Sequence, residues 1–159
     1  MGVLIGILLV IIVVFLYNKC LSSSLTNTQV NDLEEAQFAE TIRNSPMTQH
    51  LQSFLLEKFG DLNSEEIHKL RQLAAGGGRA GYIMEVRKDG ILFNLIRRNG
   101  ESIEKWAISF DALGYQDLPS KGIKTLKDIL LQTLNEIPHL MVLDTGFFMY
   151  QKNREKQSW

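Results

Sequence analysis

Residues 76–81 read GGGRAG and match the spacing of the phosphate-binding motif G-x-G-x-x-G. A dinucleotide site needs these glycines between a strand and a following helix, because the pyrophosphate is bound at the N-terminus of that helix. In this chain the spacing of apolar residues predicts a helix before the glycines and a strand after them. We therefore interpret the stretch as a helix C-cap with a hinge, not as a nucleotide site.

Asp144, Thr145 and Gly146 form the Asp-Thr-Gly triplet that is typical of aspartic proteases. That chemistry needs two carboxylates that share one proton, supplied by two copies of the motif or by a dimer. A tight turn between two strands explains the same three residues. We adopt the turn as the interpretation.

Other residue types that carry chemistry are sparse. Cys20 is the single cysteine, so an intramolecular disulfide and a multi-cysteine zinc site are excluded. None of the three histidines belongs to an H-E-x-x-H motif, and no Ser-His-Asp or Cys-His spacing is informative. We therefore assign no catalytic residue, metal site or cofactor. Cys20 follows a predicted membrane segment and is instead a candidate for acylation or dimer formation.

Five basic residues are candidates for one surface patch, namely Lys121, Lys124, Lys127, Arg97 and Arg98. The three lysines line one side of the start of a predicted helix, where the helix dipole already places partial positive charge. Cations are mildly destabilising there, which indicates another reason for them. Our hypothesis is a patch that meets anionic lipid headgroups or an acidic partner. The alternative is a solvated face on which Asp117 and Asp128 offset part of the charge.

The charge balance bounds the class of protein. The chain has 159 residues, of which 22% are charged, and its formal net charge is −1. This length fits one domain of ordinary size. A nucleic-acid-binding domain would carry an excess of Lys and Arg, so we expect no nucleic-acid partner.

Residues 3–17 read VLIGILLVIIVVFLY, without a charge or a strongly polar group. Together with the two preceding residues they would form roughly 25 Å of helix, at about 1.5 Å per residue, against a hydrocarbon core of about 30 Å. Lys19 can extend to the headgroups, and Tyr17 suits the interface. The sequence therefore predicts a transmembrane anchor over residues 1–19, with residues 1–17 in contact with the bilayer.

Two alternatives concern this segment. A cleaved signal peptide is conceivable, because small residues lie in 20–24, but a positively charged region before the apolar run is missing. If the anchor is retained, Lys19 is the close flanking charge, and the positive-inside rule then favours a cytoplasmic domain. A periplasmic or extracellular domain is the alternative orientation.

Three helical patterns follow a polar linker over residues 20–29. The first has an apolar stripe between Val30 and Ile42 with acidic residues at its start. The second is opened by Pro46, keeps a clean amphipathic spacing and ends at Gly60. The third is predicted to start with an N-cap box of Asn63 and Glu66 and to run to Gly76.

The pattern changes to period two between residues 82 and 110 and predicts a three-stranded meander. Asp89-Gly90 and Asn99-Gly100 are strong signals for two-residue hairpin turns. If both turns are of type I′, the register places Val86 opposite Phe93, Met84 opposite Leu95, Phe93 opposite Trp106 and Ile91 opposite Ile108. These residues form one apolar face, which we predict to be core.

The opposite face of this meander carries a predicted cross-strand row of isoleucines, formed by Ile83, Ile96 and Ile103. Either the N-terminal helices cover this row, or it is a contact surface for another chain. A further helix between Ile123 and Ile137 and two short strands, 140–143 and 147–150, complete the pattern.

The order α-α-α-β-β-β-α-β-β predicts an α+β domain over residues 30–152, with helices packed on an antiparallel sheet, followed by a polar tail over 153–159. We expect a single-pass membrane protein whose domain is an interaction or scaffold module, with a protein partner or a second copy of the chain as ligand. The alternatives are a membrane-tethered enzyme with dispersed catalytic residues and an exported soluble protein. A pocket lined by perturbed titratable groups would favour the enzyme.

Overall fold

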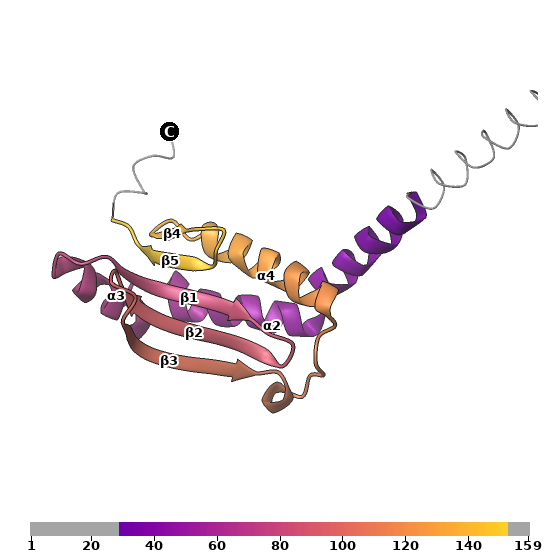
Figure 1. Cartoon of the computed structure of the whole chain (residues 1–159), viewed down its shortest axis with the longest axis horizontal. Coiled ribbons are helices and arrows are strands. Elements are labelled where there is room, and N and C mark those ends of the chain that lie inside the picture. The colour runs from indigo at the N-terminus through magenta and orange to yellow at the C-terminus, as the bar shows by residue number, and fades with distance from the viewer. Residues whose placement is uncertain (1–28, 153–159) are drawn as a thin grey trace, which may run out of the picture. The chain divides into compact units, whose positions relative to one another are not determined.

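The computed structural model describes residues 29–152, which confirm the predicted α+β class (Figure 1). The predicted anchor, Cys20, the linker up to residue 28 and the tail 153–159 lie outside this range. Within it, no helix is both long and apolar enough to cross a membrane. The chain divides into two units, Met1–Glu40 and Thr41–Trp159, and the second carries the whole sheet.

The helices agree with the predicted patterns, with differences at their ends. Residues 29–43 are helical. Three helices follow, namely α2 (Pro46–Leu55), α3 (Glu65–Ala75) and α4 (Ser120–Asn135), with a π-helical segment η1 (Leu56–Gly60) after α2 and a short 3-10 segment η2 (Asp111–Leu113). Ser64 rather than Asn63 caps α3, because the Ser64 hydroxyl accepts from the Ile67 amide, whereas the Asn63 amide donates to Asp61 in the preceding loop.

The π-helical segment η1 is tied to the strand region by a buried histidine. His139 Nε2 lies 2.7 Å from the Phe59 carbonyl oxygen, and His139 is only 4% exposed. A carbonyl oxygen can only accept, so His139 must carry its proton on Nε2. The bond fixes the end of the second helix against the entry to β4.

Five strands form one antiparallel sheet in the order β3-β2-β1-β5-β4. Their bounds are β1 (Ala80–Val86), β2 (Gly90–Arg97), β3 (Ser102–Ser109), β4 (Leu140–Val142) and β5 (Phe147–Tyr150). The predicted meander and the two short strands around Asp144 are therefore confirmed. The last two strands join the sheet beside β1, which leaves β3 at one edge and β4 at the other.

The predicted register between β1 and β2 is wrong by two residues. Val86 pairs with Ile91 and not with Phe93. The turn is not of type I′, because neither Asp89 nor Gly90 has the positive φ that this type needs. The carbonyls of Lys88 and Asp89 instead accept from the amides of Leu118 and Phe110. A shift of two residues keeps each side chain on its predicted face, so the predicted core survives.

The β2–β3 pairing follows the prediction over most of its length. Phe93 lies opposite Trp106, and Ile91 lies opposite Ile108. Near the turn, however, a bulge puts Ile96 opposite Ser102. Gly100 alone has a positive φ in this turn, 84°, which fits a three-residue loop with a bulge rather than a type I′ turn. The predicted isoleucine row is therefore not a direct row of cross-strand pairs.

The core lies between the sheet and helices α2, α3 and α4. Phe59 from η1 packs edge-on against Tyr82 and Phe148, with ring centroids 5.3 and 4.9 Å apart, and contacts Phe93 at 5.9 Å. All four rings are fully buried. Burial of each such side chain stabilises the fold by about 1.5–3 kcal/mol.

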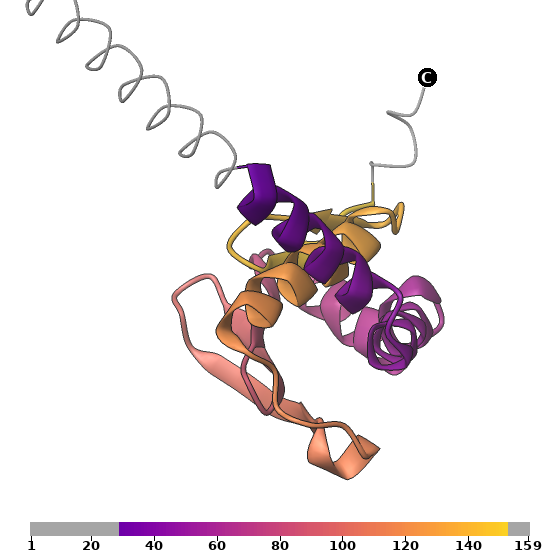
Figure 2. The ribbon, with the colours of Figure 1, turned by 90° about the vertical axis from the view of Figure 1, so that its right-hand side faces the viewer.

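The other face of the sheet is not covered by α2, α3 or α4, which all lie on the core side (Figure 2). Ile83 and Ile96 on this face are half-buried, and Ile103 is 40% exposed. Of the two alternatives for the isoleucines, coverage by α2 and α3 is excluded. The helices have one apolar stripe each, and these stripes are used on the core face.

Gly90 is required by the close approach of β3. A Cβ atom at this position would lie 2.2 Å from the Ile108 carbonyl oxygen. We predict that Gly90→Ala lowers the free energy of unfolding by about 2–3 kcal/mol, because the strand backbone must shift to relieve the overlap. Urea unfolding of the full chain in detergent, followed by circular dichroism, measures the change.

Gly78→Ala is the matched control. No atom lies within 4 Å of a Cβ at Gly78, and its φ is not in the left-handed region. This variant should change the free energy of unfolding by less than about 0.5 kcal/mol. Equal stability of the two variants would contradict the close packing of β2 and β3.

Candidate functional site

Strand β3 forms an open edge of the sheet (Figure 1). The Phe110 amide donates to the Asp89 carbonyl oxygen, so these two residues begin the ladder as a hydrogen-bonded pair. Such pairs recur every second residue in an antiparallel ladder, which turns the backbone groups of Ile108 and Trp106 toward β2. The amide and carbonyl groups of the alternate residues, Ala107 and Ser109, therefore point away from the sheet.

A groove of about 530 Å³ lies beside this edge. Residues 106–109 and Glu104 of β3 form one side, and side chains from α2, η1 and α3 form the other. Leu113 from η2 lies at one end. An exposed strand edge with a helix-lined groove next to it can hold an extended chain, because the edge supplies hydrogen bonds and the groove accepts side chains.

Trp106 is the main apolar surface of the groove. Its indole is stacked on Phe93, with centroids 4.3 Å apart and planes 18° from parallel, and Phe54 meets it edge-on at 5.9 Å. Trp106 remains half-exposed, whereas Phe93 is fully buried. The ring is therefore held in one orientation by the core and still has surface left for a ligand.

Charged side chains from η1, α3 and β3 line the rest of the groove. Lys69 Nζ lies 3.0 Å from a Glu65 oxygen and 3.1 Å from a Glu104 oxygen. The hydrogen bond with Glu65 raises the pKa of Lys69 and lowers the pKa of Glu65. Glu66 is only 8% exposed and has a longer contact, 3.8 Å, with Lys58. Three carboxylates against two ammonium groups leave the groove net negative.

The hydroxyl of Tyr82 is buried in the core behind the side chains that line the groove. It has no hydrogen-bond partner within the part of the chain that the structure describes, and the Tyr82 side chain is fully buried. Burial raises the pKa of Tyr82, because the charged phenolate would lose its hydration. Tyr82 therefore stays protonated at neutral pH and serves the core as an aromatic ring.

The predicted basic patch is separated into two groups. Arg97 and Arg98 follow β2 at one end of the sheet. Lys121, Lys124 and Lys127 lie on α4, which begins shortly after Leu118 bonds to Lys88 at the opposite end of β2. The eight residues of β2 thus stand between the two groups.

The glycine stretch follows a helix, and the Asp-Thr-Gly triplet lies in a turn between two strands, as we expected. The glycines 76–78 follow α3 and precede β1. Gly146 has a φ of 94° in the turn between β4 and β5, and its carbonyl accepts from the Met84 amide at 2.9 Å. Over residues 29–152, no cluster of three His, Cys, Asp or Glu side chains has the arrangement of a metal site.

Sequence reasoning missed the groove, although Trp106 and Ile108 were placed correctly on the core face. The missing information was the sheet order, because nothing local shows that β5 pairs with β1 and leaves β3 unpaired. The spacing of Glu65 and Lys69, four residues apart in a helix, was a usable local signal for their ion pair.

No protein-family model matches this chain, and no curated protein and no solved structure matches it either.

The ion pair of Glu65 and Lys69 predicts a pH effect. Because Glu65 has a folded-state pKa below its ordinary value of 4.5, the pair stabilises the fold above that pH, and this stabilisation is lost as the pH falls through the folded-state pKa. In Lys69→Met, the Glu65 pKa should rise toward 4.5, and unfolding should depend less on pH in this acid range. A carboxyl-carbon NMR titration with parallel urea unfolding measures both effects.

Lys58→Met is the control for that titration, since Lys58 has the smallest influence on the Glu65 pKa. Its Glu65 titration should resemble that of the wild type. If Glu65 titrates identically in Lys69→Met and in the wild type, the two side chains are not paired in solution.

Proposed function

We propose that this chain is a membrane-tethered binding module whose α+β domain holds an extended segment of a protein partner along β3. The observation that carries the proposal is the free β3 edge beside a groove with a half-exposed tryptophan. Addition of a strand to such an edge is a common mode of peptide recognition, in which the main chain supplies affinity and alternate side chains supply specificity.

The docking segment is residues 106–109. Edge strands are often protected against pairing by charges, prolines or bulges. In β3 these features lie at the hairpin end, where Glu104 and Lys105 are charged and the bulge lies near Ser102. Residues 106–109 read WAIS and contain neither a charge nor a proline.

The alternation of the sheet predicts which side chains the partner needs. Side chains of an added strand that point to the helix side would contact Trp106 and Ile108, so we infer apolar residues at every second position. The next such position toward the hairpin lies at Glu104. A basic side chain there would complement the net negative charge of the groove.

The shifted pKa values in and behind the groove are those of charge pairing and burial. The pKa values of Lys69 and Tyr82 are both raised, so both groups stay protonated at neutral pH and neither is a general base. Glu65 has a lowered pKa and stays ionised, so it is a poor general acid.

Backbone hydrogen exchange tests the proposed docking mode. The probes are ten-residue peptides with apolar residues at alternate positions, selected on an array against the full chain in detergent. On binding, we expect the amides of Ala107 and Ser109 to exchange at least about tenfold more slowly, because they gain hydrogen bonds. Trp106 and Ile108 should change little, since their amides already bond to β2.

Ala107→Pro and Ala107→Val form a matched pair for this test. Proline removes an outward amide that no β2 residue uses, so the fold should persist, while peptide affinity falls by about tenfold or more. Valine keeps the amide and should bind normally. Equal affinity of both variants, or protection of residues outside β3 instead of Ala107 and Ser109, would overturn the proposal.

The tether itself rests on the sequence of residues 1–19 and is tested by topology. Two C-terminal reporters are compared, one that works only in the cytoplasm and one that works only outside it, and each fusion is fractionated and its N-terminus sequenced. We expect the cytoplasmic reporter to be active and the N-terminus to be intact in the membrane fraction. An active external reporter would reverse the orientation. A soluble product that lacks residues 1 to about 22 would instead identify a cleaved signal peptide.

A further inference from the structure

A second hollow, of about 420 Å³, lies where α3 ends against the start of β1 and the end of β2. Its charged lining residues are Arg79, Arg97 and Arg98, and it has no acidic lining residue. Ala80 pairs with Arg97 in the sheet, which places Arg79 and Arg98 beside that pair. Three cations from two distant segments of the sequence are thus gathered around one hollow.

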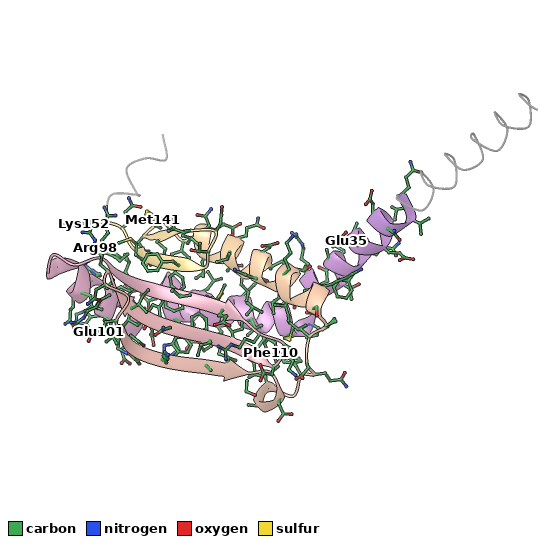
Figure 3. All side chains as sticks on the ribbon, in the orientation of Figure 1. Glu35, Arg98, Glu101, Phe110, Met141 and Lys152 are labelled. Carbon is green, nitrogen blue, oxygen red and sulfur yellow. The ribbon has the colours of Figure 1, made fainter. Side chains whose placement is uncertain are left out.

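The arginines are only partly compensated by carboxylates. Arg97 has a contact of 3.6 Å with Glu101, on the far side of the hairpin turn. Over residues 29–152, Arg79 and Arg98 make no ion pair. Figure 3 shows Arg98 and Lys152 at the same end of the domain, and the acidic residue Glu101 also lies there. Like charges that are brought together destabilise the fold unless an anion joins them.

The remaining lining residues suit a small ligand. The Asn99 side-chain oxygen accepts from the Glu101 amide, so its NH₂ group is turned outward as a donor. Leu73 and Ala80 supply apolar surface, and a Cβ at Gly78 would meet nothing within 4 Å, so the backbone is open to contact. The C-terminus of α3 carries partial negative charge, so the guanidinium groups must supply the attraction.

We propose that this hollow binds the phosphate group of a small phosphate monoester. Guanidinium groups form paired hydrogen bonds with phosphate oxygens, and two or three around one site are typical of phosphate recognition. The volume falls within the range of small-molecule pockets. The site is separate from the β3 groove and does not depend on the function proposed for it.

Phenyl phosphate binding to the full chain in detergent tests the site. Isothermal titration at fixed ionic strength should show one site for phenyl phosphate in the wild type. The double variant Arg79→Gln with Arg98→Gln should lose about tenfold or more in affinity, because two charge-assisted contacts are removed. Its unfolding temperature without ligand should stay at or above the wild-type value, since both arginines are exposed and their removal relieves like-charge repulsion.

Lys121→Gln with Lys124→Gln is the matched control, because it removes the same charge from exposed positions at the other end of the sheet. This variant should bind phenyl phosphate as the wild type does. An equal loss in both double variants would identify a general charge effect and overturn the site. Absence of wild-type binding would overturn it as well.

Two further arms identify the source of the phosphate. If the natural ligand is a lipid headgroup, nanodiscs that contain a phosphatidylinositol monophosphate should compete with phenyl phosphate, and nanodiscs without it should not. An unchanged affinity in both nanodiscs supports a soluble ester in the same site. A phosphopeptide that binds far more tightly, with the same dependence on Arg79 and Arg98, would overturn the assignment to a small ligand.

Discussion

The packing of Phe59 against the aromatic core is the contact on which the rest of the domain depends. Its ring touches Tyr82, Phe93 and Phe148, which come from three different strands of the sheet. The hydrogen bond from His139 to the Phe59 carbonyl fixes the same residue from the backbone side. Phe59 therefore joins the α2–η1 segment, the meander and the C-terminal strands in one core.

The π-helical turn around Phe59 is part of this arrangement. The α-helical pattern after Pro46 continues as η1 from Leu56 to Gly60, where the wider turn carries the Phe59 ring into the core and its carbonyl to His139. π-Helical turns are uncommon and often accompany a structural or functional demand. Here Lys58, the residue before Phe59, lines the groove beside β3. Core packing and the candidate site thus share one irregular turn.

Helix coverage and strand order decide which surfaces of the sheet the described helices leave uncovered. Helices α2, α3 and α4 use their apolar stripes on the same face, so none of these three covers the face with Ile83 and Ile96. The strand order places β3 at the edge. Trp106 lies where the aromatic core reaches that edge, stacked on Phe93 and still half-exposed. The opposite edge, β4, has only three residues and offers a much shorter docking length.

Local signals in the sequence were sufficient for the elements and their faces. Period two placed Met84, Phe93 and Trp106 on the core face, and Pro46 marked the start of α2. The predicted faces were correct because alternation acts between residues close in the chain, whereas the predicted type I′ turns and the predicted Asn63 cap were wrong. Local signals could not predict the register of the first hairpin, because the Lys88 and Asp89 carbonyls accept hydrogen bonds from a loop more than twenty residues away.

Only the tertiary structure determines which charged and aromatic side chains lie together at a candidate site. Pairing of Ala80 with Arg97 brings Arg79 to the arginines of the β2–β3 hairpin, whereas the length of β2 separates those arginines from Lys121. Pairing of β5 with β1 leaves β3 at the edge and so creates the groove at Trp106. Such pairings join residues far apart in sequence and are selected by packing across the whole core, so no local pattern in the sequence contains them.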